Sequence, residues 1–189
     1  MLLDTIKFDN LVDRMFAESL ILHRTINLFE GVDENTAEMV IKYVQFLENL
    51  DSKKPITILI SSPGGECYAG LAIYDAIKAC KCPVSTVATG LAMSMGSVIL
   101  AAGTPGLRKS HKNCTIMLHE PSGFAIGRSS EAENSVKELK RIKNLMSDIY
   151  LETSGGKLTK RKLKEIFTKD TYMTPEEALE LGLIDEIIT

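Results

Sequence analysis

Three short runs of β-branched and apolar residues constrain most strongly what this chain can fold into. They are Ile56–Ile60, Val84–Ala88 and Cys114–Leu118, and each has the length and composition of a buried strand. Apolar helix patterns follow the first two runs, around Leu71–Cys80 and Met93–Ala102. Successive strand-turn-helix units imply parallel strands joined by right-handed crossovers, with functional sites beyond the C-terminal ends of the strands. The sequence therefore predicts an α/β fold with its chemistry at that edge of the sheet.

Composition narrows the class of protein. The chain has 189 residues, of which 44% are hydrophobic and 25% are charged, so it can bury the core of one globular domain. A net charge of -3 provides no basic surface of the kind that binds nucleic acids, and no nucleic-acid partner is expected. The longest apolar stretch, Val84–Gly103, is interrupted by polar residues, so no membrane span is expected.

The N-terminus and the cysteines indicate the compartment. Met1–Asp4 lacks the basic flank and the apolar run of a secretion signal. A cytoplasmic protein with free thiols is therefore expected, although the 4 cysteines could pair into two disulfides. Cys80 and Cys82 do not have the C-x-x-C spacing of a zinc site. No metal and no other cofactor is expected.

Other segments fall outside the repeated units. Residues 1–24 are mixed in character and predict an N-terminal helix or arm, ahead of a single domain over 25–189. Arg108–Lys112 is expected to be a solvated basic loop. Thr174–Glu177 has the pattern of a capping box at the start of a helix, and Leu183–Ile188 that of a closing strand.

A long helix is predicted from Ser130 to about Thr153, with Ser130 and Glu133 as its capping box. At ~1.5 Å per residue this helix would be about 35 Å long, as wide as the whole domain, so part of it should project. One face carries an apolar stripe: Val136, Leu139, Ile142, Met146 and Ile149. A projecting stripe of this kind needs a partner to cover it.

Two polar residues are placed for nucleophilic chemistry. Small residues two positions before and after Ser94 allow a sharp turn from strand into helix, a relaxed form of the G-x-S-x-G elbow. The backbone N–H of Met95 would then face a developing oxyanion. His119 ends the third strand, where a neutral imidazole can take the proton of a nearby hydroxyl. Taken alone, such a serine is more often a helix cap and such a histidine more often structural.

Two further features are ambiguous on their own. Gly64 and Gly65 follow the first strand and form either a tight turn or a pair of free N–H donors for an oxyanion. Their spacing is not that of a phosphate-binding loop, which argues against a nucleotide site. Asp170 is by itself one carboxylate among 25 acidic residues.

In combination, four segments resemble the ClpP family of self-compartmentalising serine peptidases. The segments are Ser61–Gly65, Gly90–Ser97, Met117–Pro121, and Tyr172–Ala178 together with Gly182–Asp185. They occur in the family's order and at nearly its spacing, over about residues 20–188. The resemblance implies a ClpP/crotonase-like spiral of β-β-α units, with a protruding handle helix at about 125–168.

The resemblance also implies roles for single residues. Ser94 matches the family's nucleophile, His119 its general base and Asp170 the carboxylate that orients the histidine. Gly65 and Met95 match the residues whose backbone N–H groups form the oxyanion hole. The implied activity is endopeptidase cleavage of peptides and unfolded proteins through an acyl-enzyme intermediate.

The same resemblance implies an assembly and a partner. Seven subunits would form a ring, and two rings would stack as a tetradecamer through interdigitating handles. An AAA+ unfoldase would be the partner and would use the ATP, so that this chain itself needs no cofactor.

The sequence departs from the family in several places. Glu120 stands where the family has Gln, and a carboxylate near His119 would favour the charged imidazole. Thr168 and Lys169 replace a Glu-Arg pair that links the rings. Ser122–Phe124 replaces Leu-Gly-Gly, and residues 1–19 do not match the family's N-terminal segment.

Two alternatives to a serine peptidase follow from the same fold. A crotonase-type acyl-CoA enzyme would have Glu or Asp in place of the serine and the histidine. A non-catalytic ClpP-like ring subunit would only assemble, and such subunits typically lack triad residues. The presence of Ser94, His119 and Asp170 favours the peptidase.

Overall fold

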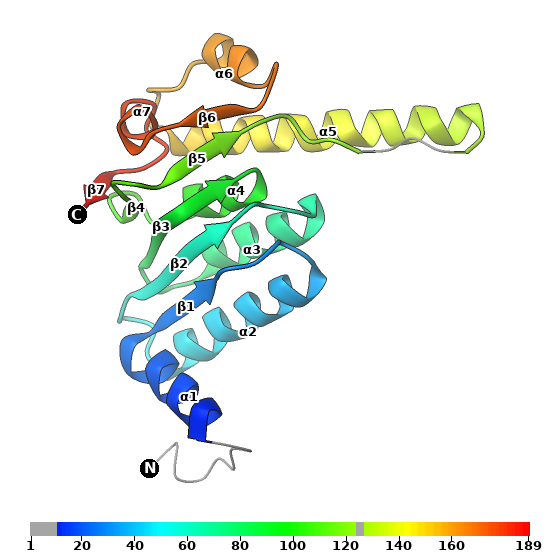
Figure 1. Cartoon of the computed structure of the whole chain (residues 1–189). Helices are drawn as coiled ribbons and strands as arrows, with labels where there is room; N and C mark the ends of the chain where they lie inside the picture. The colour runs from blue at the N-terminus through cyan, green and yellow to red at the C-terminus, as the bar shows by residue number, and fades with distance from the viewer. Residues whose placement is uncertain (1–10, 124–126) are drawn as a thin grey trace.

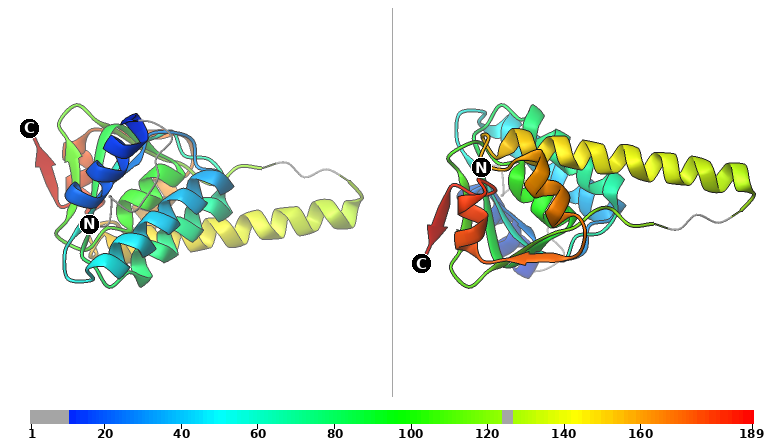
Figure 2. Two further views of the ribbon diagram at one scale, coloured as in Figure 1. Left: turned by 90° about the horizontal axis from the view of Figure 1, so that it is seen from below. Right: turned by 90° about the horizontal axis from the view of Figure 1, so that it is seen from above.

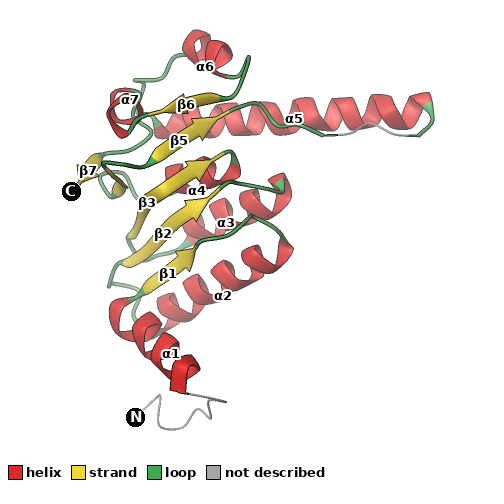
Figure 3. Cartoon of the chain, in the orientation of Figure 1, coloured by secondary structure: helices red, strands yellow, loops and turns green. Residues whose placement is uncertain are grey.

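A sheet of seven strands organises the part of the chain that the structure, a computed structural model, describes: residues 11–123 and 127–189 (Figures 1 and 3). The strands are β1 (Thr25–Leu28), β2 (Ile56–Ser62), β3 (Val84–Met93), β4 (Arg108–His111), β5 (Thr115–Leu118), β6 (Thr171–Met173) and β7 (Glu186–Ile188). The helices are α1 (Leu11–His23), α2 (Glu34–Leu50), α3 (Cys67–Ala79), α4 (Met95–Ala101), α5 (Ser129–Thr153), α6 (Lys160–Ile166) and α7 (Pro175–Glu180).

The sheet is mainly parallel, as the sequence predicts. β1, β2, β3, β4 and β7 are neighbours in that order, and each pair is parallel. β5 also runs parallel to β3, whereas β6 is antiparallel to β5. The C-terminal ends of β2, β3 and β5 therefore reach one edge of the sheet, where Gly64, Ser94 and His119 follow.

Helices α2, α3 and α4 cover one face of the sheet (Figure 1). In β2 the side chains of Ile56, Ile58 and Ile60 are fully buried in the core, whereas the residues between them are half-buried. This alternation is that of a strand with one face on the core. Helix α1 lies at the β1 end of the sheet, and the rest of the predicted N-terminal helix or arm, residues 1–10, lies outside the described residues (Figure 1).

Strand β3 continues through Gly90, so the predicted strand Val84–Ala88 is too short, and the expectation that it breaks at this glycine is wrong. Gly90 has a φ of +70°, which glycine adopts without strain. Before it, Thr86 to Ala88 pair with β4, and after it, Leu91 to Met93 pair with β5. The glycine lets one strand change neighbours, and this brings β5 beside the end of β3.

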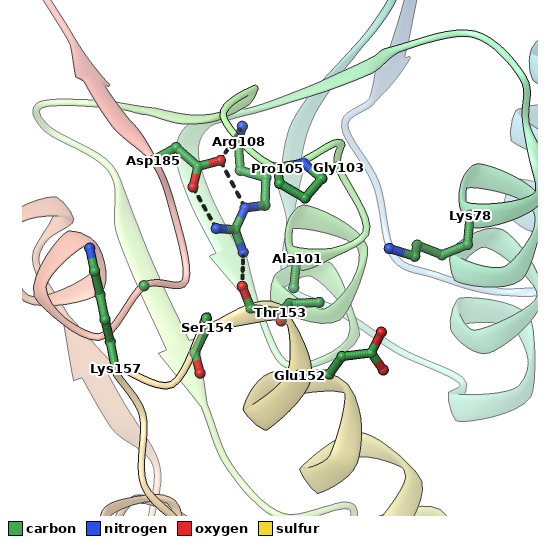
Figure 4. Close-up of a pocket in the computed structure, with 12 residues that line it drawn as sticks. Lys78, Ala101, Gly103, Pro105, Arg108, Glu152, Thr153, Ser154, Lys157 and Asp185 are labelled. Carbon is green, nitrogen blue, oxygen red and sulfur yellow. Dashed lines mark hydrogen bonds and ion pairs between the residues drawn. The ribbon is translucent and has the colours of Figure 1, made fainter.

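The predicted basic loop at Arg108–Lys112 is also wrong, because Arg108–His111 forms β4 and Arg108 is buried. Its Nε and Nη2 donate to the carboxylate of Asp185 at 2.9 and 2.5 Å, and its Nη1 donates to the carbonyl oxygen of Thr153 at 2.7 Å (Figure 4). A buried guanidinium needs partners of this kind. The ion pair joins β4, the end of α5 and the segment before β7, beside a cavity of about 360 Å³.

Helix α5 begins before the predicted capping box. The carboxylate of Glu131 accepts the backbone N–H of Arg128 at 2.8 Å, so the prediction of Ser130 and Glu133 was two residues late. At the C-terminal end of the chain, the predicted capping box is confirmed, since Thr174 and Glu177 each accept the other's backbone N–H.

Helix α5 projects from the body by its N-terminal half (Figures 1 and 2). Its buried residues, Ile142, Met146 and Tyr150, lie in its C-terminal half, where it packs against α4. Val136, in the predicted apolar stripe, is exposed. Residues 125–126, the start of the expected handle, lie outside the described residues.

Two further observations bear on the predicted class of protein. The four cysteines are free thiols. Over residues 11–123 and 127–189, no helix combines the length and the apolar character needed to cross a lipid bilayer.

Candidate active site

Ser94 occupies a strained turn between β3 and α4. Its φ of +50° and ψ of −122° lie outside the regions that residues with a side chain normally adopt. Its N–H donates to the carbonyl oxygen of Met117 at 2.9 Å, and its own carbonyl oxygen accepts the N–H groups of Ser97 and Val98 at 3.0 and 3.3 Å. Strained residues that are held in this way cluster at functional sites, and this turn has the form of a nucleophile elbow.

Gly64 and Gly96 lie so close to this turn and to β2 that neither position has space for a side chain. A Cβ on Gly64, whose φ is +88°, would lie 2.6 Å from the Cβ of Ser94 and 2.8 Å from the backbone nitrogen of Met95. A Cβ on Gly96 would lie 2.9 Å from the carbonyl oxygen of Ser62. The sequence predicts Gly64 as part of a tight turn or as an oxyanion donor, and it does not show that this glycine packs directly on Ser94.

The three residues expected to form a triad are joined by hydrogen bonds. The Oγ of Ser94 lies 2.8 Å from the Nε2 of His119, and the Nδ1 of His119 lies 3.1 Å from the Oδ1 of Asp170. The side chain of His119 is 25% exposed and that of Asp170 is 58% exposed. The three hydrogen-bonded residues therefore run from a half-buried turn out to the surface.

Strand register explains why these residues meet. In the parallel pair β3–β5, Met93 lies opposite Met117, so Ser94 and His119 both follow at the ends of neighbouring strands. In the antiparallel pair β5–β6, Leu118 lies opposite Thr171. One step further along the same register, Asp170 lies opposite His119, at the separation that lets cross-strand side chains interact.

The two residues expected to supply an oxyanion hole flank the same site. Met95 is the first residue of α4, so its N–H has no acceptor within the helix. Gly65 has a φ of +155° and follows Gly64 into the turn. No described residue accepts a hydrogen bond from the N–H of Gly65 or Met95. The side chain of Met95 is fully buried, which leaves only its backbone for contact with a ligand.

A cavity of about 310 Å³ adjoins Ser94 and His119, and Gly65, Cys67 and Met146 also line it. Burial raises the pKa of the Cys67 thiol. A thiol of this kind stays protonated at neutral pH and is therefore a weak nucleophile. Among the described residues, no group of three or more His, Cys, Asp or Glu could hold a metal ion.

Glu120, the acidic residue after His119, pairs with a lysine and not with the His119 imidazole. Its carboxylate forms an ion pair with the ammonium of Lys143 on α5. Ser122 lines the cavity, and Gly123 lies against Leu139 of α5. Phe124, which completes this departure from the family, lies outside the described residues.

Two buried hydroxyl groups close to Ser94, those of Ser97 and Tyr150, were not predicted from the sequence. The Oγ of Ser97 lies 2.8 Å from the hydroxyl oxygen of Tyr150, and both residues are buried. The two are 53 residues apart in the chain, so no local pattern could have paired them.

Comparison with known families agrees with the motifs and the fold. The family model described as Clp protease matches residues 10–189, nearly the whole chain. The mixed α/β fold expected from the resemblance is thereby confirmed, and the chain belongs to the Clp protease family.

Proposed function

We propose that this chain is a serine endopeptidase that cleaves peptides and unfolded proteins with Ser94, His119 and Asp170. The observation that carries the proposal is the continuous hydrogen-bonded path from the Oγ of Ser94 through both ring nitrogens of His119 to Asp170. A peptidase triad requires a nucleophile, a base and an orienting carboxylate in this order of contact.

In the proposed reaction, the Oγ of Ser94 attacks the peptide carbonyl carbon while the Nε2 of His119 takes the hydroxyl proton. Asp170 accepts the Nδ1–H, which fixes the tautomer that leaves Nε2 free to act as base. The N–H groups of Gly65 and Met95 stabilise the oxyanion of the tetrahedral intermediate. His119 then protonates the leaving amine, and water hydrolyses the acyl-Ser94 ester by the same route. Protein groups supply every step, so no cofactor is needed in this chain.

The site geometry favours this function over the two alternatives. A crotonase-type enzyme polarises a thioester and works with an acidic residue, whereas here a serine hydroxyl contacts an imidazole at 2.8 Å. A non-catalytic ring subunit has no need of a serine held in a strained turn against that imidazole.

The proposal extends to assembly. Seven chains would form a ring and two rings a tetradecamer in the cytoplasm, served by an AAA+ unfoldase. The projecting half of α5 supports this, because it exposes Val136, which would be covered by a neighbouring copy.

Hydrolysis of a short fluorogenic peptide tests the catalytic role of Ser94. Replacement of Ser94 by Ala should lower kcat on the order of 10³-fold or more, because the nucleophile is removed. The control is Ser52→Ala, in the exposed loop between α2 and β2, which should leave the rate unchanged. A Ser94→Ala protein that hydrolyses the peptide at the wild-type rate would contradict the proposal.

A further inference from the structure

A buried hydroxyl pair connects helix α5 to the turn that carries Ser94. The Oγ of Ser97 donates to the carbonyl oxygens of Ser94 and Met117, at 2.7 and 3.1 Å. The hydroxyl oxygen of Tyr150 lies 2.8 Å from the same Oγ. Because the single Ser97 proton is engaged with the two carbonyl groups, the Tyr150 hydroxyl is the donor in the third hydrogen bond.

The Ser97 hydroxyl joins the two chain segments whose separation decides the Ser94–His119 distance. Ser94 directly follows β3, and Met117 lies on β5, two residues before His119. The Met117 carbonyl oxygen accepts both the Ser97 hydroxyl and the N–H of Ser94. Displacement of the Ser97 hydroxyl would therefore loosen the turn with respect to the strand that carries His119.

Tyr150 is well suited to hold the Ser97 hydroxyl in place. It is fully buried, and burial raises its pKa above the ordinary value, so the hydroxyl keeps the proton that it donates. Its ring also meets that of Phe167 edge to face, with centroids 6.2 Å apart. Phe167 lies three residues before Asp170, at the end of α6.

We infer that Tyr150 is a positioning residue, whose hydroxyl acts through Ser97 to hold Ser94 within hydrogen-bonding distance of His119. The inference rests on the proposed function, since it assigns Tyr150 a part in the same site. The C-terminal half of α5 thereby contributes a hydrogen bond that holds the site in place, while the N-terminal half of the same helix projects away from the body.

Removal of the Tyr150 hydroxyl tests the inference. Tyr150→Phe should lower both kcat for the fluorogenic peptide and the rate of Ser94 modification by a fluorophosphonate about 10-fold, because a small misplacement of a reacting group is costly. KM should change by no more than about 2-fold, since substrate contacts remain. The matched control is Tyr74→Phe, because Tyr74 is also buried but its hydroxyl bonds to none of the described residues.

A double-mutant cycle separates positioning through Ser97 from a general effect on the fold. Ser97→Ala should lower the modification rate at least as much as Tyr150→Phe, and the double variant should be no slower than Ser97→Ala alone. Losses that multiply in the double variant would overturn the inference. If the far-UV circular dichroism of Tyr150→Phe shows that this variant is not folded, Ser97→Ala alone tests the inference. An unchanged rate of Ser94 modification in Ser97→Ala would then overturn the inference.

The outcomes distinguish this inference from the proposed function. If wild-type Ser94 is not modified and no peptide is cleaved, the proposed function fails and the inference fails with it. If the wild type reacts and Tyr150→Phe reacts as fast as Tyr74→Phe, only the inference fails.

Discussion

At the scale of single residues, the backbone of Ser94 shows how this fold presents a reactive hydroxyl. A backbone conformation that residues with a side chain rarely adopt costs about 1–3 kcal/mol, and here the hydrogen bonds to Met117, Ser97 and Val98 offset that cost. In this conformation the side chain leaves the line of β3 and reaches His119. The strain is therefore retained where the proposed chemistry needs it.

The contact between Gly64 and Ser94 gives a prediction at this scale. Gly64→Ala should abolish peptide hydrolysis, because the new Cβ would overlap the Cβ of Ser94 and the backbone nitrogen of Met95. Gly106→Ala is the control for backbone strain, since Gly106 has the same φ of +88° and no atom within 4 Å of an added Cβ. Peptidase rates of the two purified proteins check this, and equal rates would show that Gly64 does not shape the site.

At the scale of elements, strand pairing explains which parts of the site the sequence could predict. The C-terminal ends of β3 and β5 meet because both strands are parallel, so the nearness of Ser94 and His119 followed from the strand pattern. The position of Asp170 next to His119 could not be predicted from the strand pattern. It depends on β6, which has three residues and no recognisable alternation, and only the family resemblance identified it.

Long-range partners explain what the sequence pattern missed. Arg108–His111 has the composition of a surface loop, but it pairs as a strand with β3 and β7. Its buried Arg108 is paired with Asp185, 77 residues away. The link between Ser97 and Tyr150 is of the same kind. Hydropathy patterns report burial along one element, and they do not report which polar groups satisfy each other across elements.

The Arg108–Asp185 pair gives a prediction for stability. Asp185→Asn should lower the free energy of unfolding at pH 7 by about 2–3 kcal/mol, less than for a fully buried pair because Asp185 is partly exposed. Glu186→Gln, which removes the more exposed ion pair with Lys109, should cost less than about 1 kcal/mol. Urea unfolding at one protein concentration measures both, and equal losses would contradict this account.

The same pair should make stability depend on pH. Burial raises the pKa of the Asp185 carboxyl, but hydrogen bonds from Arg108 outweigh it, so the folded-state pKa lies below the ordinary 3.8. The contribution of the pair is therefore complete well above pH 3.8 and is lost as the pH falls through the folded-state pKa. Urea unfolding of wild type and Asp185→Asn should accordingly differ at pH 7 and converge at the acid end. A difference that stays constant with pH would argue against the ion pair.

At the scale of the whole molecule, helix α5 combines two roles. Its inner half is buried against the body and carries Tyr150, whereas its outer half extends away from the sheet (Figure 2). The sequence predicted this projection from helix length alone. What it could not show is where the buried half begins, because that depends on packing against α4.

Assembly gives a prediction at this scale. Light scattering should show a ring of about 146 kDa (7 × 20.8 kDa) or a stacked pair of rings of about 291 kDa (14 × 20.8 kDa). Val136→Asp should weaken the stacking of rings and favour the smaller mass, because it places a charge where the exposed apolar side chain would be covered. Asn134→Asp adds the same charge at an exposed polar position of α5 and should leave the mass unchanged. A monomer mass for the wild type would refute the ring.

The measurement that tests the central claim most directly is the mass of the protein after reaction with a serine-directed fluorophosphonate, followed by peptide mapping. We expect one adduct per chain, located on Ser94, and none in the Ser94→Ala variant, because His119 activates this hydroxyl alone. Peptide hydrolysis that continues without an adduct on Ser94, or an adduct on another serine such as Ser122 in the same cavity, would contradict the assignment of Ser94 as the nucleophile.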